Sequence, residues 1–331
     1  MTQIYLEEKE KEDSLPVRKK KISRYLKFYL IPGWRDPGFT TQEYEIGKIK
    51  SKRRFFRRLL TPLTIAGMVM ILFIAFWAVY APILTQYTIE ELSLGGGIPT
   101  YAPPFADPSP ENPLGTTKYG FDVLGRLIWG ARTALTAAAV PVIISLGGGI
   151  IAGSISAYFG GVVDSVIMRI VDIMYSFPML ILVIILAPMV GRDLYNILGI
   201  YGILFIPYST RFVRSLVLQV KQNVYVRAAV TSGAEKFKVM FKHIFPNTLS
   251  PIIISFFGSM AGAVLGFASL AFLGLADEQI TDWGTDILYA RDHSLAYWAV
   301  LWPGLLIAIT AIGFMLIGDG LRDALDPRLH I

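Results

Sequence analysis

The run LLTPLTIAGMVMILFIAFWAVYAPIL, residues 59–84, contains no Asp, Glu, Lys, Arg or His. A helix that crosses the hydrocarbon core of a bilayer, which is about 30 Å thick, needs roughly 20 mostly apolar residues. This run is long enough to cross a membrane once. It therefore predicts that the chain is an integral membrane protein.

Five further stretches that lack charged residues and histidine follow this run. Backbone groups in lipid must bond within a helix or a closed barrel, and these stretches are much longer than the strands of about 10 residues that form barrels. We therefore predict an all-α fold, a polytopic bundle of six transmembrane helices, rather than the buried helices of a large soluble protein. The five stretches are residues 133–163, 173–191, 194–210, 244–276 and 294–318.

The composition supports a single membrane-embedded unit. Hydrophobic residues make up 53% of the 331 residues, and the mean hydropathy is +0.51; soluble domains usually contain less than about 50% apolar residues. There is no cysteine, which excludes disulfides, iron–sulfur clusters and thiol catalysis. Residues 1–20 are charged and lack the apolar core of a signal peptide, so we expect the first span to stay in the membrane.

A basic arm precedes the first span. Residues 1–60 contain about half of the 31 lysines and arginines, and the arm ends in KRRFFRR at residues 52–58. A basic arm can bind nucleic acid or an anionic membrane surface, but its position next to a span favours the membrane surface. We predict a basic cytoplasmic arm at 1–58, a six-helix transmembrane domain at 59–331, and no nucleic-acid partner.

The distribution of charge predicts the orientation, because lysine and arginine are enriched on the cytoplasmic side of membrane proteins. The N-terminal arm and the loop around 215–248 are basic, and the C-terminal segment carries Arg322 and Arg328, whereas the segments around 85–130 and 277–286 are acidic. We therefore expect both termini and the 215–248 loop in the cytoplasm. The Pro- and Gly-rich loop 85–130 is expected outside. Residues 125–132 are expected to start an interfacial helix that leads into the second span.

Two patterns predict how helices pack. Glycines at a spacing of four allow close approach of membrane helices; Gly149 and Gly153 form one such set, and the other consists of Gly258, Gly262 and Gly266. Either set could serve packing within the chain or contact with another subunit. In the segment 163–178, Arg169 and Asp172 can pair on one helix, and Pro178 should kink it. This segment is expected to be the cytoplasmic end of the third helix.

Motifs for catalysis are absent from the sequence. There is no GxxxxGK[ST] loop to bind ATP phosphates, no HExxH and no GxSxG. The three histidines are not at metal-ligand spacing, and the acidic residues lie in loops where water can solvate them. We therefore predict that the chain is not an enzyme and that its sites are neither catalytic nor metal-binding.

One polar stretch interrupts the apolar chain: YVRAAVTSGAEKFKVMFKHIFPN, residues 225–247. Phe237, Met240, Phe241 and Ile244 form one apolar helical stripe, and Pro246 is expected to end that helix. A first short helix at 224–232 and a turn at Gly233 complete a helix–turn–helix. Such a unit could dock a cytoplasmic partner, lie in the interface as an amphipathic helix, cap the bundle or contact phospholipid.

The same stretch resembles the EAA loop of ABC importer permeases, with RAA at 227–229, then Gly233, then HIFPN at 243–247. Three other segments resemble the dipeptide and oligopeptide (and nickel) permease family, specifically its C-type subunit. They are NPLGTTKYGFDVLGRLIWGAR at 112–132, FLGL at 272–275 with DWG at 282–284, and GDGLRDALDPRL at 318–329. The resemblance covers roughly residues 60–331.

This resemblance implies the type I importer fold and four kinds of partner. A homologous B-type permease would form a heterodimer with the chain, two cytoplasmic ATPases would bind ATP and Mg²⁺, an extracytoplasmic binding protein would deliver substrate, and lipid would surround the spans. No cofactor is expected in this chain itself. The ATPase-coupling role would fall to Arg227, Ala228, Ala229, Gly233, Ala234, Lys236, Phe237, Met240, His243, Pro246 and Asn247.

The chain departs from the family pattern at two positions. Arg227 replaces the usual Glu of the EAA motif, which reverses a charge at the expected ATPase contact, and Asn112 stands where His is usual. Peptides are the expected substrate, with oligosaccharides or nickel as alternatives. Two other classes remain: an ion-coupled secondary transporter, disfavoured because the spans lack a central Asp, Glu or His, and a scaffold or channel subunit.

Overall fold

The computed structural model describes residues 59–94, 102–191, 193–277, 279–293 and 295–325. Residues 62–322 form one compact unit. The basic arm predicted at 1–58 and part of the C-terminal motif at 318–329 lie outside the described residues, so the role of the arm stays a prediction.

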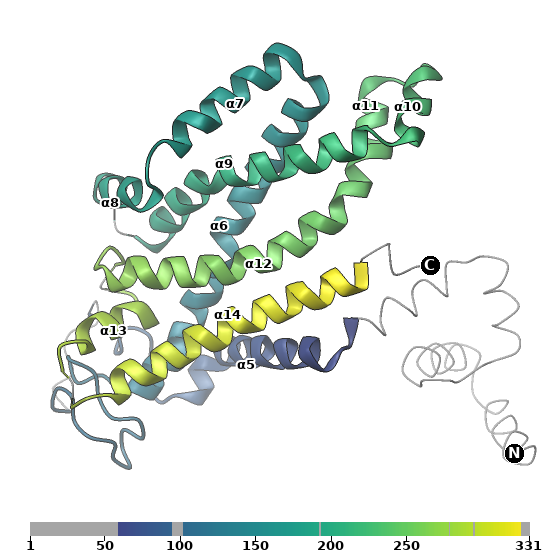
Figure 1. Cartoon of the computed structure of the whole chain (residues 1–331). Coiled ribbons are helices and arrows are strands. Elements are labelled where there is room, and N and C mark those ends of the chain that lie inside the picture. The colour runs from purple at the N-terminus through teal and green to yellow at the C-terminus, as the bar shows by residue number, and fades with distance from the viewer. Residues whose placement is uncertain (1–58, 95–101, 192, 278, 294, 326–331) are drawn as a thin grey trace, which may run out of the picture. The chain divides into compact units, whose positions relative to one another are not determined.

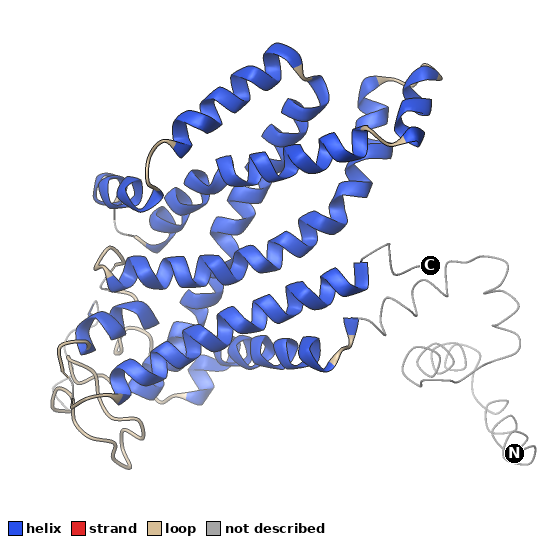
Figure 2. Cartoon of the chain, in the orientation of Figure 1, coloured by secondary structure: helices blue, strands red, loops and turns tan. Residues whose placement is uncertain are grey.

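The described residues form helices and no strand (Figures 1 and 2), which confirms the predicted all-α fold. The α-helices are α5 (Pro62–Leu84), α6 (Val123–Phe159), α7 (Gly161–Tyr175), α8 (Met179–Val190), α9 (Leu194–Lys221), α10 (Val224–Thr231), α11 (Lys236–Val239), α12 (Phe245–Phe272), α13 (Trp283–Ala290) and α14 (Trp298–Leu325). A π-helical turn, η2 (Met240–Ile244), joins α11 to α12.

Four of the six predicted spans are confirmed as helices that are long and apolar enough to cross a membrane: α5, α6, the continuous helix Lys236–Phe272, and α14. The third predicted span is a bent pair, since α7 and α8 meet at 84°, and Pro178 lies at the break as expected. The fourth corresponds to α9, a helix of 28 residues. The structure is compatible with six spans, and the exact number stays a prediction.

Helix α6 is longer than the sequence predicted. The Asp122 carboxylate caps it by accepting a hydrogen bond of 2.7 Å from the Gly125 amide, and the helix then runs for 37 residues. Residues 125–132, predicted to start a helix that leads into the second span, form the first turns of α6 and are continuous with that span. A side-chain cap satisfies amides at the helix start, so the helix can begin well before the apolar run.

The glycines of α6 allow α9 to approach its backbone. A Cβ added at Gly153 would lie 2.6 Å from the Thr210 carbonyl oxygen, and one added at Gly202 of α9 would lie 2.8 Å from the Ile144 Cβ. Both distances are too short for real atoms, so only glycine fits at either position. The first predicted glycine set therefore serves packing within the chain.

The second glycine set divides in two. At Gly266 a Cβ would collide with the Tyr201 side chain, whereas at Gly258 and Gly262 it would meet no atom within 4 Å. Gly266 therefore packs within the chain. Gly258 and Gly262 instead present a bare strip of α12 to open space.

Two ion pairs tie α7 to α9. Asp164 accepts two hydrogen bonds of 2.6 Å from Arg214, and Asp172 pairs with Arg211. The sequence suggested a local pair between Arg169 and Asp172, and the structure instead pairs Asp172 across to the neighbouring helix. These bonds hold α7 along α9 although α7 buries only Val171 among its side chains.

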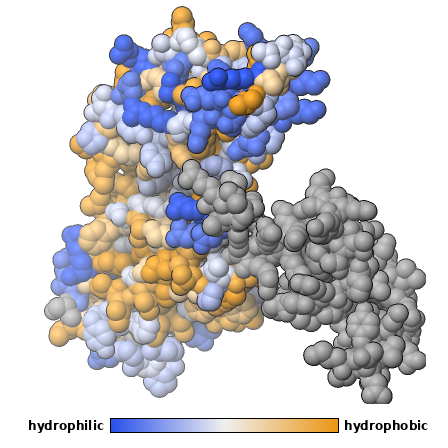
Figure 3. All heavy atoms as spheres, turned by 45° about the vertical axis from the view of Figure 1, so that its right-hand side comes forward, coloured by the Kyte–Doolittle hydropathy of each residue, from blue (hydrophilic) through white to orange (hydrophobic). Residues whose placement is uncertain are grey.

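The surface of the unit is largely apolar. Figure 3 shows a hydrophobic body, with hydrophilic side chains concentrated around the end that carries α10 and α11. Only 22% of the most apolar stretch of α5 is buried. Exposed apolar side chains on this scale would be unfavourable in water and are expected in lipid.

Candidate functional site

The α10–α11 segment, residues 223–247, is the predicted coupling site, and its first part folds as expected. Helix α10 ends in a tight turn in which Gly233 has φ +81°, and the Ala234 amide donates to the Ala229 carbonyl at 3.1 Å. A Cβ at Gly233 would meet no atom within 4 Å. Glycine is therefore required here by its left-handed backbone and not by crowding within this chain.

Buried apolar side chains anchor the segment on the bundle. Val226 of α10, Val239 of α11 and Ile244 of η2 are each at most 1% exposed. They pack in one cluster with Val213 and Val217 of α9. The segment is thus seated on the end of α9, and a force applied to it reaches the bundle through direct contacts.

The predicted end of the second helix at Pro246 is wrong. The chain is helical from Lys236 to Phe272, and Pro246 lies in the first turn of α12. A proline is tolerated at that position because first-turn amides have no partner within their own helix. Within this helix, the Asn247 side-chain amide donates to the His243 carbonyl at 2.7 Å. The segment is therefore joined to α12 without a flexible break.

The predicted apolar stripe is divided between the interior and the surface. Ile244 is buried, whereas Phe237 and Phe241 are 66% and 62% exposed. On α10 the exposed apolar side chains include Val224, Tyr225 and Val230. The other predicted site residues follow the same division: Arg227, Ala228, Lys236 and Asn247 are exposed, and Ala229, Ala234, Met240 and His243 are half-buried.

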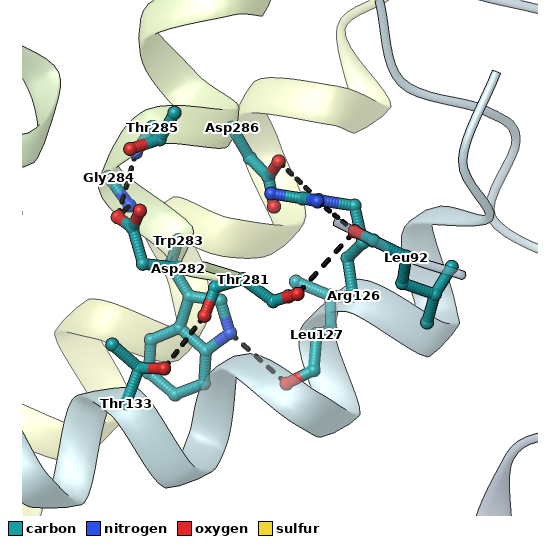
Figure 4. A network of polar contacts seen from close by, with 10 residues as sticks. All are labelled: Leu92, Arg126, Leu127, Thr133, Thr281, Asp282, Trp283, Gly284, Thr285 and Asp286. Carbon is teal, nitrogen blue, oxygen red and sulfur yellow. Dashed lines mark hydrogen bonds and ion pairs between the residues drawn. The ribbon is translucent and has the colours of Figure 1, made fainter. Parts of the chain in front are cut away.

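A second polar site, which sequence reasoning missed, lies where α6 meets α13 (Figure 4). Arg126 donates to the Asp286 carboxylate at 2.6 Å, and each side chain is 5% exposed. Its guanidinium also donates to the Leu92 carbonyl. Sequence analysis placed Asp286 among solvated loop acids, although a charge this close to a span requires a partner. That requirement was the signal that could have identified the pair.

Hydrogen bonds around this pair fix α13 in place. Asp282 caps α13 by accepting from the Gly284 and Thr285 amides, both at 2.9 Å. Thr133 donates to the Thr281 carbonyl at 2.8 Å, and the Trp283 indole donates to a carbonyl of α6 at 3.1 Å. We call the residues drawn in Figure 4 the α13 network.

Burial raises the pKa of Asp286, the neighbouring Arg126 guanidinium lowers it and the charge of Asp282 raises it, and the combined effect is a pKa of about 6. Burial also raises the pKa of Asp282. Because water is excluded, the ionised carboxylate loses hydration that one ion pair restores only in part. The hydrogen bonds of the α13 network join α6 to α13, and the arrangement is best explained as a structural core.

A cavity of about 560 Å³ opens between α6, α9 and α12. Tyr201, Phe205, Tyr208 and Phe212 line it from α9. Gly258 and Gly262 line it from α12, at the strip where no atom of the described residues lies within 4 Å of an added Cβ. Among the described residues, no group of His, Cys, Asp or Glu could hold a metal ion.

Comparisons with known proteins agree on one family. Residues 149–331 match the family of binding-protein-dependent transport system inner membrane components. The chain is 34% identical to a dipeptide transport system permease of Alkalihalophilus pseudofirmus, over 89% of this chain and 95% of that protein. It is 34% identical to a probable D,D-dipeptide permease of Escherichia coli, over 81% of this chain and 88% of that protein. It is 33% identical to a glutathione permease of Pectobacterium atrosepticum, over 84% of this chain and 90% of that protein.

The chain belongs to this family. It is a membrane-spanning permease subunit of an ABC importer with the type I permease fold, as the sequence resemblance predicted. It is therefore a transport subunit and not an enzyme, and ATP hydrolysis falls to separate subunits of the importer. The match includes α7 to α14 and the whole α10–α11 segment.

Proposed function

We propose that this subunit imports small peptides and that the α10–α11 segment couples it to cytoplasmic ATPases. Relatives whose names specify dipeptides, D,D-dipeptides and glutathione support a peptide substrate over nickel or an oligosaccharide. The observation that best supports the coupling role is that α10 packs on the bundle with one face and exposes the other. Val226 is buried against the bundle while Val224 and Val230 remain exposed on the same short helix.

The exposed residues of α10 would enter a cleft of an ATPase subunit that binds ATP and Mg²⁺. A second, homologous permease would complete the membrane part, and an extracytoplasmic binding protein would deliver the peptide at the opposite face. Movement of the ATPases on binding ATP would then displace α10, and the buried contacts of Val226 and Val239 would pass that displacement to α9.

Gly233→Val tests the coupling role. A β-branched residue in left-handed geometry costs about 1–2 kcal/mol and distorts the turn after α10, while the membrane bundle should still insert. We expect near-normal membrane levels, with loss of ATP-driven peptide uptake and of ATPase co-purification. The control Ser232→Ala removes only a local bond to the Ala228 carbonyl and should be mild. Unchanged uptake and co-purification in Gly233→Val would refute the coupling role.

We further propose that the 560 Å³ cavity forms part of the substrate pathway. Gly262→Trp should fill it without strain inside this chain, because nothing lies within 4 Å of that position. Peptide uptake should fall while ATPase co-purification remains, and Gly262→Ala should retain uptake. Normal uptake in Gly262→Trp would place the pathway elsewhere.

Both termini and the α10–α11 segment are proposed to be cytoplasmic. Because the chain has no cysteine, a single introduced cysteine is the only thiol of the chain that can be labelled. Cysteine at Ser109 should react with a membrane-impermeant maleimide in intact cells, and cysteine at Ser232 should react only after the membrane is opened. The reverse labelling pattern would overturn this orientation.

A further inference from the structure

A second, smaller groove lies beside the α10–α11 segment and differs in character from the cavity between the helices. It encloses about 290 Å³ and its lining is almost wholly apolar. One wall is α6, through Ile151, Ile155 and Phe159, and the other is the helix that continues from α11 into α12, through Phe237 and Phe241. These side chains are 36% to 66% exposed, so the groove is open along its length.

Both walls belong to helices that are long and apolar enough to span a membrane, and the groove lies at the end of those helices. Phe159 is the last residue of α6, and Phe237 and Phe241 lie just before the most apolar part of the other helix. The groove is therefore at the depth where acyl chains give way to phospholipid headgroups. A hydrophobic groove at that depth is suited to bind an acyl chain of a bilayer lipid.

The groove also has a polar atom that lacks a partner. Ser154 lines the groove and is 5% exposed, and its hydroxyl has no hydrogen-bond partner within the described part of the chain. A buried hydroxyl without a partner is unfavourable. Ser154 lies five residues before Phe159, or about 7.5 Å deeper along the helix. A phospholipid has ester carbonyls at a comparable depth below its phosphate, and these can accept the bond.

Two exposed lysines neighbour the groove along the α11–α12 helix. Lys238 and Lys242 are exposed, lie about one helical turn apart, and each follows one of the lining phenylalanines in the sequence. Lys221, the nearby lysine of α9, is already engaged by the carbonyls of Ala157 and Tyr158 at 3.1 and 2.8 Å. Basic residues at this depth attract anionic headgroups.

We propose that this groove binds one anionic phospholipid. Its acyl chain lies between α6 and the α11–α12 helix, an ester carbonyl accepts the Ser154 hydroxyl, and its phosphate meets Lys238 and Lys242. The lipid would contact η2, where the coupling segment joins the membrane helix. π-helical turns often mark functional positions, and membrane composition could thereby influence coupling.

The test is native mass spectrometry of the full chain in detergent, titrated with dioleoyl phosphatidylglycerol or dioleoyl phosphatidylcholine. The unsubstituted protein, the parent, should retain phosphatidylglycerol in preference to phosphatidylcholine. Lys238→Gln with Lys242→Gln should weaken its binding roughly thirtyfold, because each of the two lysines contributes about fivefold near an anionic surface. The matched control, Lys118→Gln with Arg291→Gln, removes the same charge from residues outside the groove and should leave binding unchanged.

A second variant tests the groove itself. Ile151 is 65% exposed, so Ile151→Trp should fill the groove without disturbing the core and should abolish retention with both lysines intact. Leu301→Trp, at a 53% exposed position of α14, is its control. Retention in Ile151→Trp, or equal retention of both lipids by the parent, would overturn the proposal. Loss of the lipid from the parent when the partner subunits assemble would also overturn it and identify the groove as a protein interface.

Discussion

Three arginine–aspartate pairs that join different helices differ in their access to water. At the α13 end, Arg126 and Asp286 are each 5% exposed. Near α10, Arg214 and Asp164 are 30% and 22% exposed, and Arg211 and Asp172 are 45% and 55% exposed. The first pair is part of a buried network, and the others lie on the surface between two helices. One end is therefore built to stay fixed, and the other can rearrange at low cost.

The largest effect is expected from Arg126→Ala. It leaves the Asp286 carboxylate and the Leu92 carbonyl without their donor in a buried site, and breaking a buried pair costs about 3–5 kcal/mol. The midpoint of thermal unfolding in detergent, followed by tryptophan fluorescence, measures this loss. Arg291→Ala is the control, because its pair with Asp292 spans 3.6 Å and is 51% and 79% exposed. Equal unfolding midpoints for Arg126→Ala and Arg291→Ala would contradict the expectation that a buried pair stabilises the fold more than an exposed one.

Arg214→Ala should have a smaller effect. It removes two short hydrogen bonds to Asp164, but water can reach both groups, so we expect a loss of about 1–2 kcal/mol. The same unfolding measurement applies. A loss as large as that of Arg126→Ala would mean that the α10 end is as rigidly built as the α13 end.

Asp286 should make stability depend on pH. A carboxyl whose pKa is raised on folding favours the folded state through its bound proton. This contribution is complete below the unfolded pKa of about 3.9 and is lost as the pH rises through about 6. From pH 5 to pH 8 the loss is about 1 kcal/mol. The unfolding midpoint should fall over this range, and less steeply in Asp286→Asn. Identical slopes would contradict the raised pKa.

Arg211→Ala should have the smallest effect, below about 1 kcal/mol. The pair with Asp172 is solvated, and the stacking of the guanidinium on the Tyr175 ring, 4.0 Å from the centroid, is also exposed. Urea titration of the detergent-solubilised protein would measure this small difference. A loss above that of Arg214→Ala would show that exposure is not what ranks these pairs.

The sequence predicted those parts of the fold that depend on local patterns. Uncharged runs identified the long membrane helices, and Gly233 marked the turn after α10. The end of the second helix was predicted wrongly at Pro246, because a proline in a first turn and one that stops a helix look alike in sequence. The α13 network was missed because its arginine and aspartate are 160 residues apart, and no local pattern reports such a contact. The cavity likewise depends on where α9 and α12 lie.

The close contact between α6 and α9 has a mechanical consequence. With glycine at Gly153 and Gly202, the two backbones touch with almost no side chain between them, so neither helix can slide or roll without the other. They therefore move as one packed pair, and α6 alone, with 37 residues, is about 55 Å long. If α10 couples to an ATPase as proposed, a displacement of α10 would be carried along this pair toward Arg126, in the first turn of α6.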